Sequence, residues 1–341
     1  MRLAVDVMGG DQGPAELLEG IKLGLDAEPS IQSVLVVGAE DQLRPHLKRL
    51  GLSEPRVTLV HASEVLTMED KPVQALRKKR DCSILRAVEL VKEHAADAVI
   101  SSGNTGGIVA ASTIRLRPLE NIERPTIACV LPTVRGAFVL VDGGANPDCT
   151  PENLLQFGIM GSIYAHSMLD IDKPRVGVLS NGSEESKGTE LTRAALQLLR
   201  STPLNCIGFC EGYDLFLDRV DVVVCDGFVG NIVLKSSESL GKAVGQMLRV
   251  ELTANPIRKI GALLARGGLS RIKERMNPEA YGGAPLLGIN GCVIKIHGSA
   301  RRTTLRQAMR QSARFVSLGI NETIIREVTR LTDQIRERSS A

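Results

Sequence analysis

Short runs of apolar, mostly β-branched residues recur along the chain and predict the strands of a sheet. Several runs are apolar at almost every position, which is typical of strands covered on both faces. The predicted strands span residues 2–8, 33–38, 56–61, 97–101, 126–131, 137–142, 175–180, 205–210, 221–225 and 292–297. Segments with apolar residues at helical spacing, such as 81–94 and 189–200, lie between many of them. This alternation predicts an α/β fold with a doubly wound, mainly parallel sheet and helices on both faces.

Two parts of the pattern depart from the simple alternation of strands and helices. The strands at 126–131 and 137–142 are separated only by "PTVRG", which predicts an antiparallel hairpin. Near the C-terminus, apolar residues repeat every three or four positions from Leu305 to Ile335, and Gly319 and Asn321 divide the predicted helix in two. No linker or repeat is visible, so we expect one α/β catalytic domain over residues 1–341.

Composition narrows the class of protein. Hydrophobic residues make up 43% of the chain and charged residues 24%, as in soluble globular proteins. Aromatic residues are only 3%, which predicts an aliphatic core and argues against stacking on single-stranded nucleic acid. A net charge of +3 is too small to imply a polyanionic partner. We therefore expect no nucleic-acid partner.

The cysteines and the N-terminus indicate a cytoplasmic protein. Seven cysteines are scattered along the chain, and only Cys206 and Cys210 are close in sequence, with no second pair at zinc spacing. They fit buried small residues in a reducing compartment, so no metal site is expected. The chain starts on a strand, without a signal-peptide pattern. No apolar run approaches the roughly 20 residues of a transmembrane helix.

Glycine-rich loops follow six of the predicted strands and carry the candidate chemistry. In an open parallel sheet, ligands bind beyond the carboxyl ends of the strands, and helix N-termini there suit phosphate. One glycine turn is ordinary punctuation, but six loops on one edge favour a ligand site. The loops are "DVMGGDQGP", "SSGNTGG", "VDGGANPD", "SNGSEESKG", "CDGFVGN" and "HGSA".

The common catalytic motifs are absent from these loops. The sequence has no G-x-G-x-x-G dinucleotide fingerprint and no G-x-x-x-x-G-K-[ST] nucleotide loop. G-x-S-x-G and H-E-x-x-H are absent as well, so the chain offers no obvious serine or metal hydrolase. What remains is an anion site without a strong protein nucleophile, which suits a reaction in which the anion itself attacks.

Several motifs together resemble those of the bacterial phosphate acyltransferase family, also called acyl-ACP:phosphate transacylases. They run in family order from residue 5 to residue 300, and "DGFVGNIVLK" and "GGAPLLG" are the most specific. "SNGSEESKGTEL" departs from the usual form but keeps Glu184, Glu185, Lys187 and Gly188, and Ala300 stands where a second serine is common. The other motifs are "VDVMGGDQGP", "EDKPVQALRKKRDCS", "SSGNTGG", "VDGGANPDCTPENLLQFGIMG" and "YGGAPLLGINGCVIKIHGSA".

The resemblance implies an enzyme of phospholipid synthesis. It would transfer a long-chain fatty acyl group from acyl carrier protein to inorganic phosphate, giving acyl phosphate. The family is similar in fold to phosphotransacetylases and isopropylmalate dehydrogenases, is typically dimeric and needs no known cofactor. A homodimer is therefore expected, with a membrane glycerol-3-phosphate acyltransferase as the next enzyme.

Three residues are the catalytic candidates. Lys187, near a predicted helix start, could hold phosphate or neutralise the oxyanion, although most lysines are solvated surface residues. Asn231 could donate an N–H to the carbonyl or to phosphate, or cap a helix. His297 ends a strand and could protonate the leaving thiolate, or serve as a hydrogen-bonded structural histidine.

Other loop residues are expected to contact phosphate or pantetheine or to organise the loops. Carboxylates repel phosphate, so the aspartates fit acceptors for backbone N–H groups better than general bases. The residues are Asp6, Gly9, Gly10, Asp11, Gly103, Asn104, Thr105, Asp142, Asn146, Asp226, Gly230 and Ser299.

Residues 240–281 form a basic, amphipathic stretch that we expect to be a helical arm. Asn255-Pro256 and Gly267-Gly268 should divide it into short helices. Such a stretch can lie on an anionic membrane or pack as a helical hairpin in a dimer, and the lipophilic product favours peripheral contact with the inner face of the cell membrane. The contact residues would be Arg258, Lys259, Ile260, Leu263, Leu264 and Arg266. This basic surface, or Arg77, Lys78, Lys79 and Arg80, could receive the acidic acyl carrier protein.

Two other functions stay open on the sequence. A dehydrogenase of similar fold would need a divalent metal and a nicotinamide cofactor, and the missing glycine fingerprint argues only weakly against it because that fold binds the cofactor differently. Activity in EDTA without nucleotide would separate the two. A non-catalytic, membrane-associated scaffold that binds phosphate would show no turnover of acyl-ACP.

Overall fold

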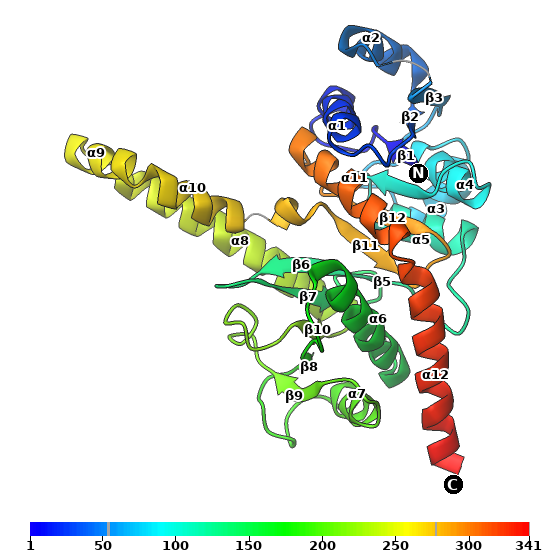
Figure 1. Ribbon diagram of the computed structural model, residues 1–341, viewed down its shortest axis with the longest axis vertical. Coiled ribbons are helices and arrows are strands. Elements are labelled where there is room, and N and C mark those ends of the chain that lie inside the picture. Colours follow the sequence, from blue (N-terminus) through cyan, green and yellow to red (C-terminus); the bar gives the residue numbers. More distant parts are fainter. Residues whose placement is uncertain (53–54, 277, 341) are drawn as a thin grey trace.

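The computed structural model describes residues 1–52, 55–276 and 278–340, and Figure 1 shows how their elements are arranged. The strands form two mostly parallel sheets. The first has the order β3-β2-β1-β4-β12-β11-β5 and the second the order β6-β7-β10-β8-β9. The predicted α/β class with mainly parallel strands is confirmed, but the strands are divided between two sheets instead of continuing through one.

The first sheet is parallel from β3 to β12. Strand β11 is antiparallel to both of its neighbours, β12 and β5, so β5 again runs in the direction of β12. The helix α1 packs against α11, and α4 packs against α5. The strands are β1 (Arg2–Asp6), β2 (Ser33–Gly38), β3 (Val57–His61), β4 (Ala98–Ser101), β5 (Thr126–Ile127), β11 (Ala284–Leu287) and β12 (Cys292–Lys295). The helices are α1 (Pro14–Ala27), α2 (Glu40–Leu50), α3 (Pro72–Lys78), α4 (Ser83–Lys92), α5 (Thr105–Arg115) and α11 (Arg302–Ser317).

The second sheet begins with the hairpin expected from "PTVRG", in which β6 and β7 pair antiparallel. The other strands of this sheet are parallel to β7. Its strands are β6 (Cys129–Pro132), β7 (Ala137–Val141), β8 (Val176–Leu179), β9 (Cys206–Cys210) and β10 (Val222–Val224). The helices around it are α6 (Pro151–Leu169), α7 (Glu190–Arg200) and α12 (Ile320–Ser340). As expected, the C-terminal helical stretch is broken at Gly319, which has a positive φ of 59°.

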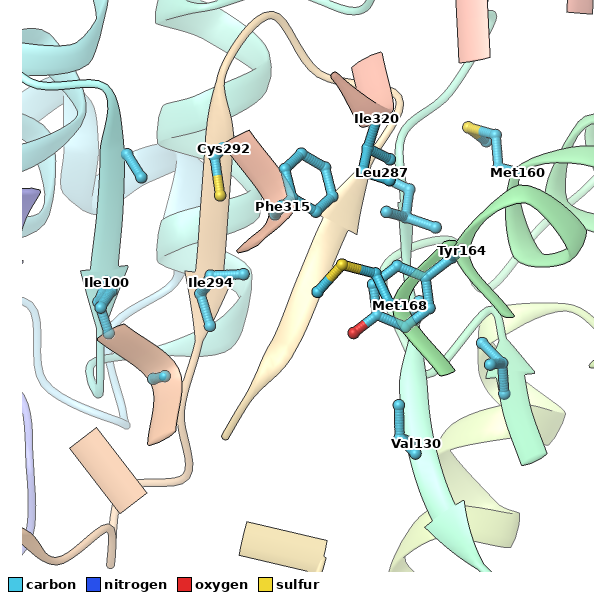
Figure 2. Packing of buried hydrophobic residues seen from close by; sticks show 14 of the residues in the cluster. Ile100, Val130, Met160, Tyr164, Met168, Leu287, Cys292, Ile294, Phe315 and Ile320 are labelled. Atoms are coloured by element: carbon cyan, nitrogen blue, oxygen red, sulfur yellow. The ribbon is translucent and has the colours of Figure 1, made fainter. Parts of the chain in front are cut away.

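One hydrophobic cluster joins the two sheets. It contains Leu3 of β1 and Val176 of β8, both fully buried. Figure 2 shows Phe315 and Tyr164 in this cluster, between the strands of the first sheet and helix α6. The Tyr164 hydroxyl is satisfied there by the side-chain amide of Gln311, which lies 2.8 Å away and donates to it. Burial of both aromatic rings therefore fixes α6 and α11 against each other.

A helical arm projects from the body of the molecule (Figure 1). It consists of the far end of α8 (Gly227–Leu252), α9 (Pro256–Leu264), α10 (Arg266–Arg275) and a short 3₁₀ helix, η1 (Pro278–Tyr281). The expected break at Asn255-Pro256 is present, with the Asn255 side chain capping α9. The second expected break is also present, but it lies at Ala265, between α9 and α10, and not at Gly267-Gly268. These glycines lie in the first turn of α10, where backbone N–H groups lack helical acceptors in any case. Within the described residues, no helix is both long and apolar enough to span a bilayer.

Candidate active site

Loops after β1, β4 and β12 meet at the carboxyl edge of the first sheet. These three strands are neighbours, so their loops converge. A Cβ on Gly9 would lie 2.3 Å from the Gly103 Cα, and only glycine allows this approach. The Asp11 amide donates to the Gly298 carbonyl at 2.8 Å. The predicted loop residues Gly9, Gly10, Asp11, Gly103 and Ser299 are thus brought together.

Asp6 stabilises this junction of loops through hydrogen bonds. Its carboxylate is buried and accepts hydrogen bonds from the Ser101 hydroxyl at 2.7 Å and the Met8 amide at 3.1 Å. Burial raises the pKa of Asp6, and these hydrogen bonds act in the opposite direction. The geometry is that of a loop-organising acceptor, since Asp6 presents no exposed carboxylate to an anion.

The start of α5 supplies Asn104 and Thr105. The Asn104 side-chain oxygen caps the helix by accepting from the Gly107 amide at 2.9 Å. Its Nδ2 donates to the backbone carbonyls of Thr67 and Met68, at 3.1 and 3.4 Å. Both the oxygen and the nitrogen of the Asn104 side-chain amide are therefore hydrogen-bonded within the protein. Thr105, at the first helical position, is exposed to solvent.

His297 is exposed directly after β12 and contacts Ser299. Its Nδ1 lies 2.8 Å from the Ser299 hydroxyl, and it accepts from the Ser299 amide at 3.2 Å. Because a backbone N–H can only donate, Nδ1 is the acceptor and the proton of the neutral ring sits on Nε2. Nε2 is therefore the ring nitrogen with which the exposed His297 can donate a hydrogen bond.

Lys295 is a candidate site residue that the sequence reasoning missed. Its ammonium contacts the Ile296 carbonyl and lies 3.4 Å from the Ser102 carbonyl. Burial lowers its pKa to about 8, against the opposing charges of Asp6 and Asp11. The sequence signal was one lysine in the otherwise apolar strand "CVIKIH", at the position that ends β12.

Asp142 organises the loop after β7 in the second sheet. Its fully buried carboxylate accepts from the backbone amides of Ile127, Gly144, Ala145 and Asn146, and from the Asn146 side chain. Burial raises the pKa of Asp142, and the hydrogen bonds oppose that effect. The Asn146 amide also donates to the Pro125 carbonyl at 2.8 Å, which ties this loop to the segment entering β5 of the first sheet.

The loop after β10 leads into α8 and positions Asn231. Asp226 caps α8 by accepting from the Val229 amide at 2.9 Å. A Cβ on Gly230 would lie only 1.8 Å from the Asp142 carbonyl oxygen, so the helix start rests on the end of β7. A Cβ on Gly144 would meet the Asn231 Cβ at 3.2 Å. Asn231 is therefore wedged against the Asp142 loop, with its side chain half-buried.

Lys187 lies on the exposed loop between β8 and α7. Its amide donates to the Glu184 carbonyl at 2.9 Å, which forms a turn, and its stem packs over Gly182. Thr189 caps the following helix. The Lys187 ammonium forms no ion pair with any residue that the structure describes, so its charge is free to meet an anion.

The candidate residues therefore fall into two groups on two sheets, not on the single edge expected. One group follows β1, β4 and β12, and the other follows β7, β8 and β10, which are also neighbours. A cavity of about 650 Å³ lies away from both groups, against α6, α7 and α12, with Asn121 and Thr329 in its lining. Across the described part of the chain, no cluster of His, Cys, Asp and Glu is arranged to hold a metal ion.

Comparison with known proteins identifies the family. A model of the family described as "Fatty acid synthesis protein" matches residues 1–323. The chain is 46% identical over 333 residues to a phosphate acyltransferase of Desulfitobacterium hafniense, covering 97% of this chain and 99% of that protein. It is 43% identical over 335 residues to a phosphate acyltransferase of Thermoanaerobacter pseudethanolicus, covering 98% and 99%. The chain belongs to the phosphate acyltransferase family. The family predicted from the motifs, and an enzyme of acyl transfer with it, is confirmed.

Solved structures with little sequence identity share the fold. A phosphotransacetylase from Streptococcus pyogenes superposes with a TM-score of 0.62 at 17% identity, covering 93% of this chain and 94% of the other. A branched-chain phosphotransacylase from Enterococcus faecalis gives 0.56 at 15% identity, covering 93% and 99%. The predicted likeness to the phosphotransacetylase fold is confirmed by these structures.

Proposed function

We propose that this phosphate acyltransferase transfers a long-chain acyl group from acyl carrier protein to inorganic phosphate. The observation that carries the proposal is the pair of glycine loop groups at the ends of neighbouring strands, in a chain that matches phosphate acyltransferases over nearly its full length. A phosphate oxygen attacks the thioester carbonyl carbon, so a C–O bond forms and the C–S bond breaks. The pantetheine thiolate leaves and takes up a proton. The product is acyl phosphate for phospholipid synthesis.

The catalytic roles follow from which polar groups are free. Phosphate is itself the nucleophile, so the enzyme positions it and stabilises the developing oxyanion. Lys187 has an unpaired ammonium and Asn231 carries an amide against the Asp142 loop, and they follow the adjacent strands β8 and β10. We assign phosphate or oxyanion contact to both. The exposed His297 carries its proton on Nε2 and would donate it to the leaving thiolate or to phosphate.

The binding residues divide into those that would touch substrate and those that shape the loops. Backbone N–H groups of the glycine loops and the exposed Thr105 would contact phosphate or pantetheine. Buried Asp6 and Asp142 and the capping Asp226 hold the loops in place instead. Asn104 and Asn146 belong with the second set, since their side-chain amides bind backbone carbonyls.

The function is tested by mixing palmitoyl-ACP, phosphate and pure protein and trapping acyl phosphate with hydroxylamine. Acyl hydroxamate should form without metal or nucleotide and should require phosphate. Lys187→Ala and Asn231→Ala should each lower turnover by about 10²–10³-fold while remaining folded. Near-normal turnover in either purified variant would remove that residue from the catalytic assignment. No hydroxamate with wild-type protein would leave the dehydrogenase and scaffold alternatives.

The helical arm supports two further assignments, a homodimer and a peripheral membrane contact. The described residues of α9 and α10 include no buried side chain. On α9, Ile257 is 83% exposed and Leu264 is 84% exposed. We assign the apolar stripe of α8, which includes Leu240 and Met247, to a second copy of the chain. We assign the α9 tip to the inner face of the cell membrane, where a glycerol-3-phosphate acyltransferase would take the product.

Both assignments have direct measurements. Light scattering should give the mass of two chains. Anionic vesicles should sediment the wild-type protein but release a variant with Arg258, Lys259 and Arg266 changed to Glu. Arg258 already pairs with Glu251 at 2.5 Å, so most of the effect should come from the other two residues. Equal sedimentation of the variant would refute the membrane contact.

A further inference from the structure

The segment of residues 67–80, which we call the basic segment, is fastened to the candidate active site. It lies between β3 and α4 and contains α3. The side-chain amide of Asn104 holds its backbone at Thr67 and Met68. A Cβ on Gly106 would come within 2.6 Å of the Pro72 ring, so α3 packs directly on the first turn of α5. The basic segment therefore borders the loop that carries Thr105.

Most of the basic side chains of the basic segment are not in ion pairs within the described residues. The segment contains five basic residues against two acidic ones, Glu69 and Asp70. Lys79 is occupied, because its ammonium pairs with Asp70 at 2.6 Å and donates to the Val65 carbonyl at 2.9 Å. The other four form no ion pair with any residue in the described part of the chain, and all four are exposed: Lys71, Arg77, Lys78 and Arg80.

Two apolar side chains stand among these charges. Met68 is 54% exposed and Val73 is 50% exposed, while Ala75 and Leu76 on the inner side of α3 are buried. Exposed apolar side chains surrounded by charges of one sign are typical of an interface with a partner of opposite charge. This surface thus has apolar side chains that an acidic protein could bury and positive charges that would attract it.

We infer that the basic segment receives the acidic carrier protein that delivers the acyl thioester. This inference rests on the proposed function. If the acyl thioester arrives on a carrier protein, the carrier must dock beside the site to deliver it. The basic segment touches the site through Asn104 and Gly106, whereas the α9 end of the arm projects away from both sheets (Figure 1). The arm is the other basic surface, and it serves as the matched control.

The experiment compares two triple charge reversals of equal size in the full-length protein. One changes Arg77, Lys78 and Arg80 to Glu, and the other changes Arg249, Arg271 and Lys273 on the arm to Glu. Each is assayed by hydroxylamine trapping with palmitoyl-ACP and, separately, with a short acyl-pantetheine that lacks the carrier. Melting curves check that both variants fold, and the KM of the wild type is also measured from low to high salt.

The basic-segment variant should raise the KM for palmitoyl-ACP about tenfold or more, with an unchanged kcat. Its rate with acyl-pantetheine and the arm variant's KM should stay at wild-type values. Salt should raise the wild-type KM and affect the basic-segment variant little, because charge steering is screened by salt.

Three results would overturn the inference: an unchanged KM in the basic-segment variant, a raised KM in the arm variant alone, or an equal loss with both thioesters. The last would mean that the segment acts only by shaping the site loop. A wild-type protein that forms no acyl phosphate from either thioester would refute the proposed function itself, which is a separate outcome.

Discussion

Substitution of Gly230 by alanine tests how the start of α8 sets the position of Asn231. The added methyl group would lie 1.8 Å from the Asp142 carbonyl oxygen, whereas real Cβ atoms essentially never approach within 3.0 Å. The helix start or the end of β7 must therefore move by about 1.2 Å. The carbonyl belongs to the backbone of the buried Asp142, whose carboxylate accepts hydrogen bonds from four surrounding backbone amides. Because these bonds hold Asp142 in place, we expect the start of α8 to move instead.

The displacement should be visible in both catalysis and stability. Asn231 follows Gly230 directly and would move with it, and a misplacement of about 1 Å can lower turnover roughly 10²-fold. Overpacking of this kind costs about 1–3 kcal/mol of unfolding free energy. We therefore expect Gly230→Ala to lower kcat about 100-fold in the hydroxylamine assay and to shift the denaturant midpoint down.

Gly245→Ala on the same helix is the matched control. A Cβ at Gly245 meets no atom within 4 Å, so alanine should leave kcat unchanged. It should add about 0.5–1 kcal/mol of stability, because glycine is the poorer helix former. If Gly230→Ala matched wild type in kcat and unfolding, the close packing of α8 on β7 would not govern the site, and the assignment of Asn231 would lose its structural basis.

Two further predictions concern buried charges. Asp142→Asn should lower the unfolding free energy by about 2–4 kcal/mol in urea melts, because an amide cannot accept all the N–H groups that converge there; a loss below about 1 kcal/mol would contradict this role. For Lys295, the folded-state pKa of about 8 lies below the ordinary value of 10.5, so between these pH values the unfolded chain binds more protons and stability rises with pH. Wild type should therefore gain roughly 2–3 kcal/mol of unfolding free energy relative to Lys295→Met from pH 8 to 10.5, and parallel pH curves would refute the buried ammonium.

Most elements could be predicted from sequence because their signals are local. Apolar runs predicted ten strands, although the run at 126–131 is divided between β5 and β6 of different sheets. Asn255 caps α9 at the expected break, whereas Asp226 caps α8 and Asn231, the cap that the sequence offered, lies inside that helix. The strand β11 was missed because "APLL" is four residues long and contains a proline, which usually argues against a strand interior. Proline is accommodated there because β11 makes few ladder pairs, with Pro285 opposite Ile294 in β12.

The division into two sheets could not be predicted from local pattern. Buried strands of either sheet have the same apolar composition, and their partners are set by contacts distant in sequence. The same limit applied to the site. The glycine loops indicated which residues gather at strand ends. They did not indicate that the side-chain amides of Asn104 and Asn146 would donate hydrogen bonds to backbone carbonyls. Lys295 was overlooked because a lysine in a strand is ordinarily a solvated residue, and only the packing shows its ammonium turned toward Ser102.

The hydrogen bonds of the aspartates explain how the site proposed for phosphate can lie near buried carboxylates. A free carboxylate would repel phosphate, but Asp6 and Asp142 have their oxygens occupied by hydroxyl and N–H donors from the surrounding loops. Each aspartate thereby fixes a loop in a close-packed arrangement, which its glycines permit and a Cβ would block. The fixed loops can then direct other N–H groups toward phosphate without reorganisation when it binds. Under the proposed function, Lys187 and His297 would contact the substrate, while the aspartate carboxylates stay buried in hydrogen bonds with the loops. Substitutions at the aspartates should therefore lower stability before they lower phosphate affinity.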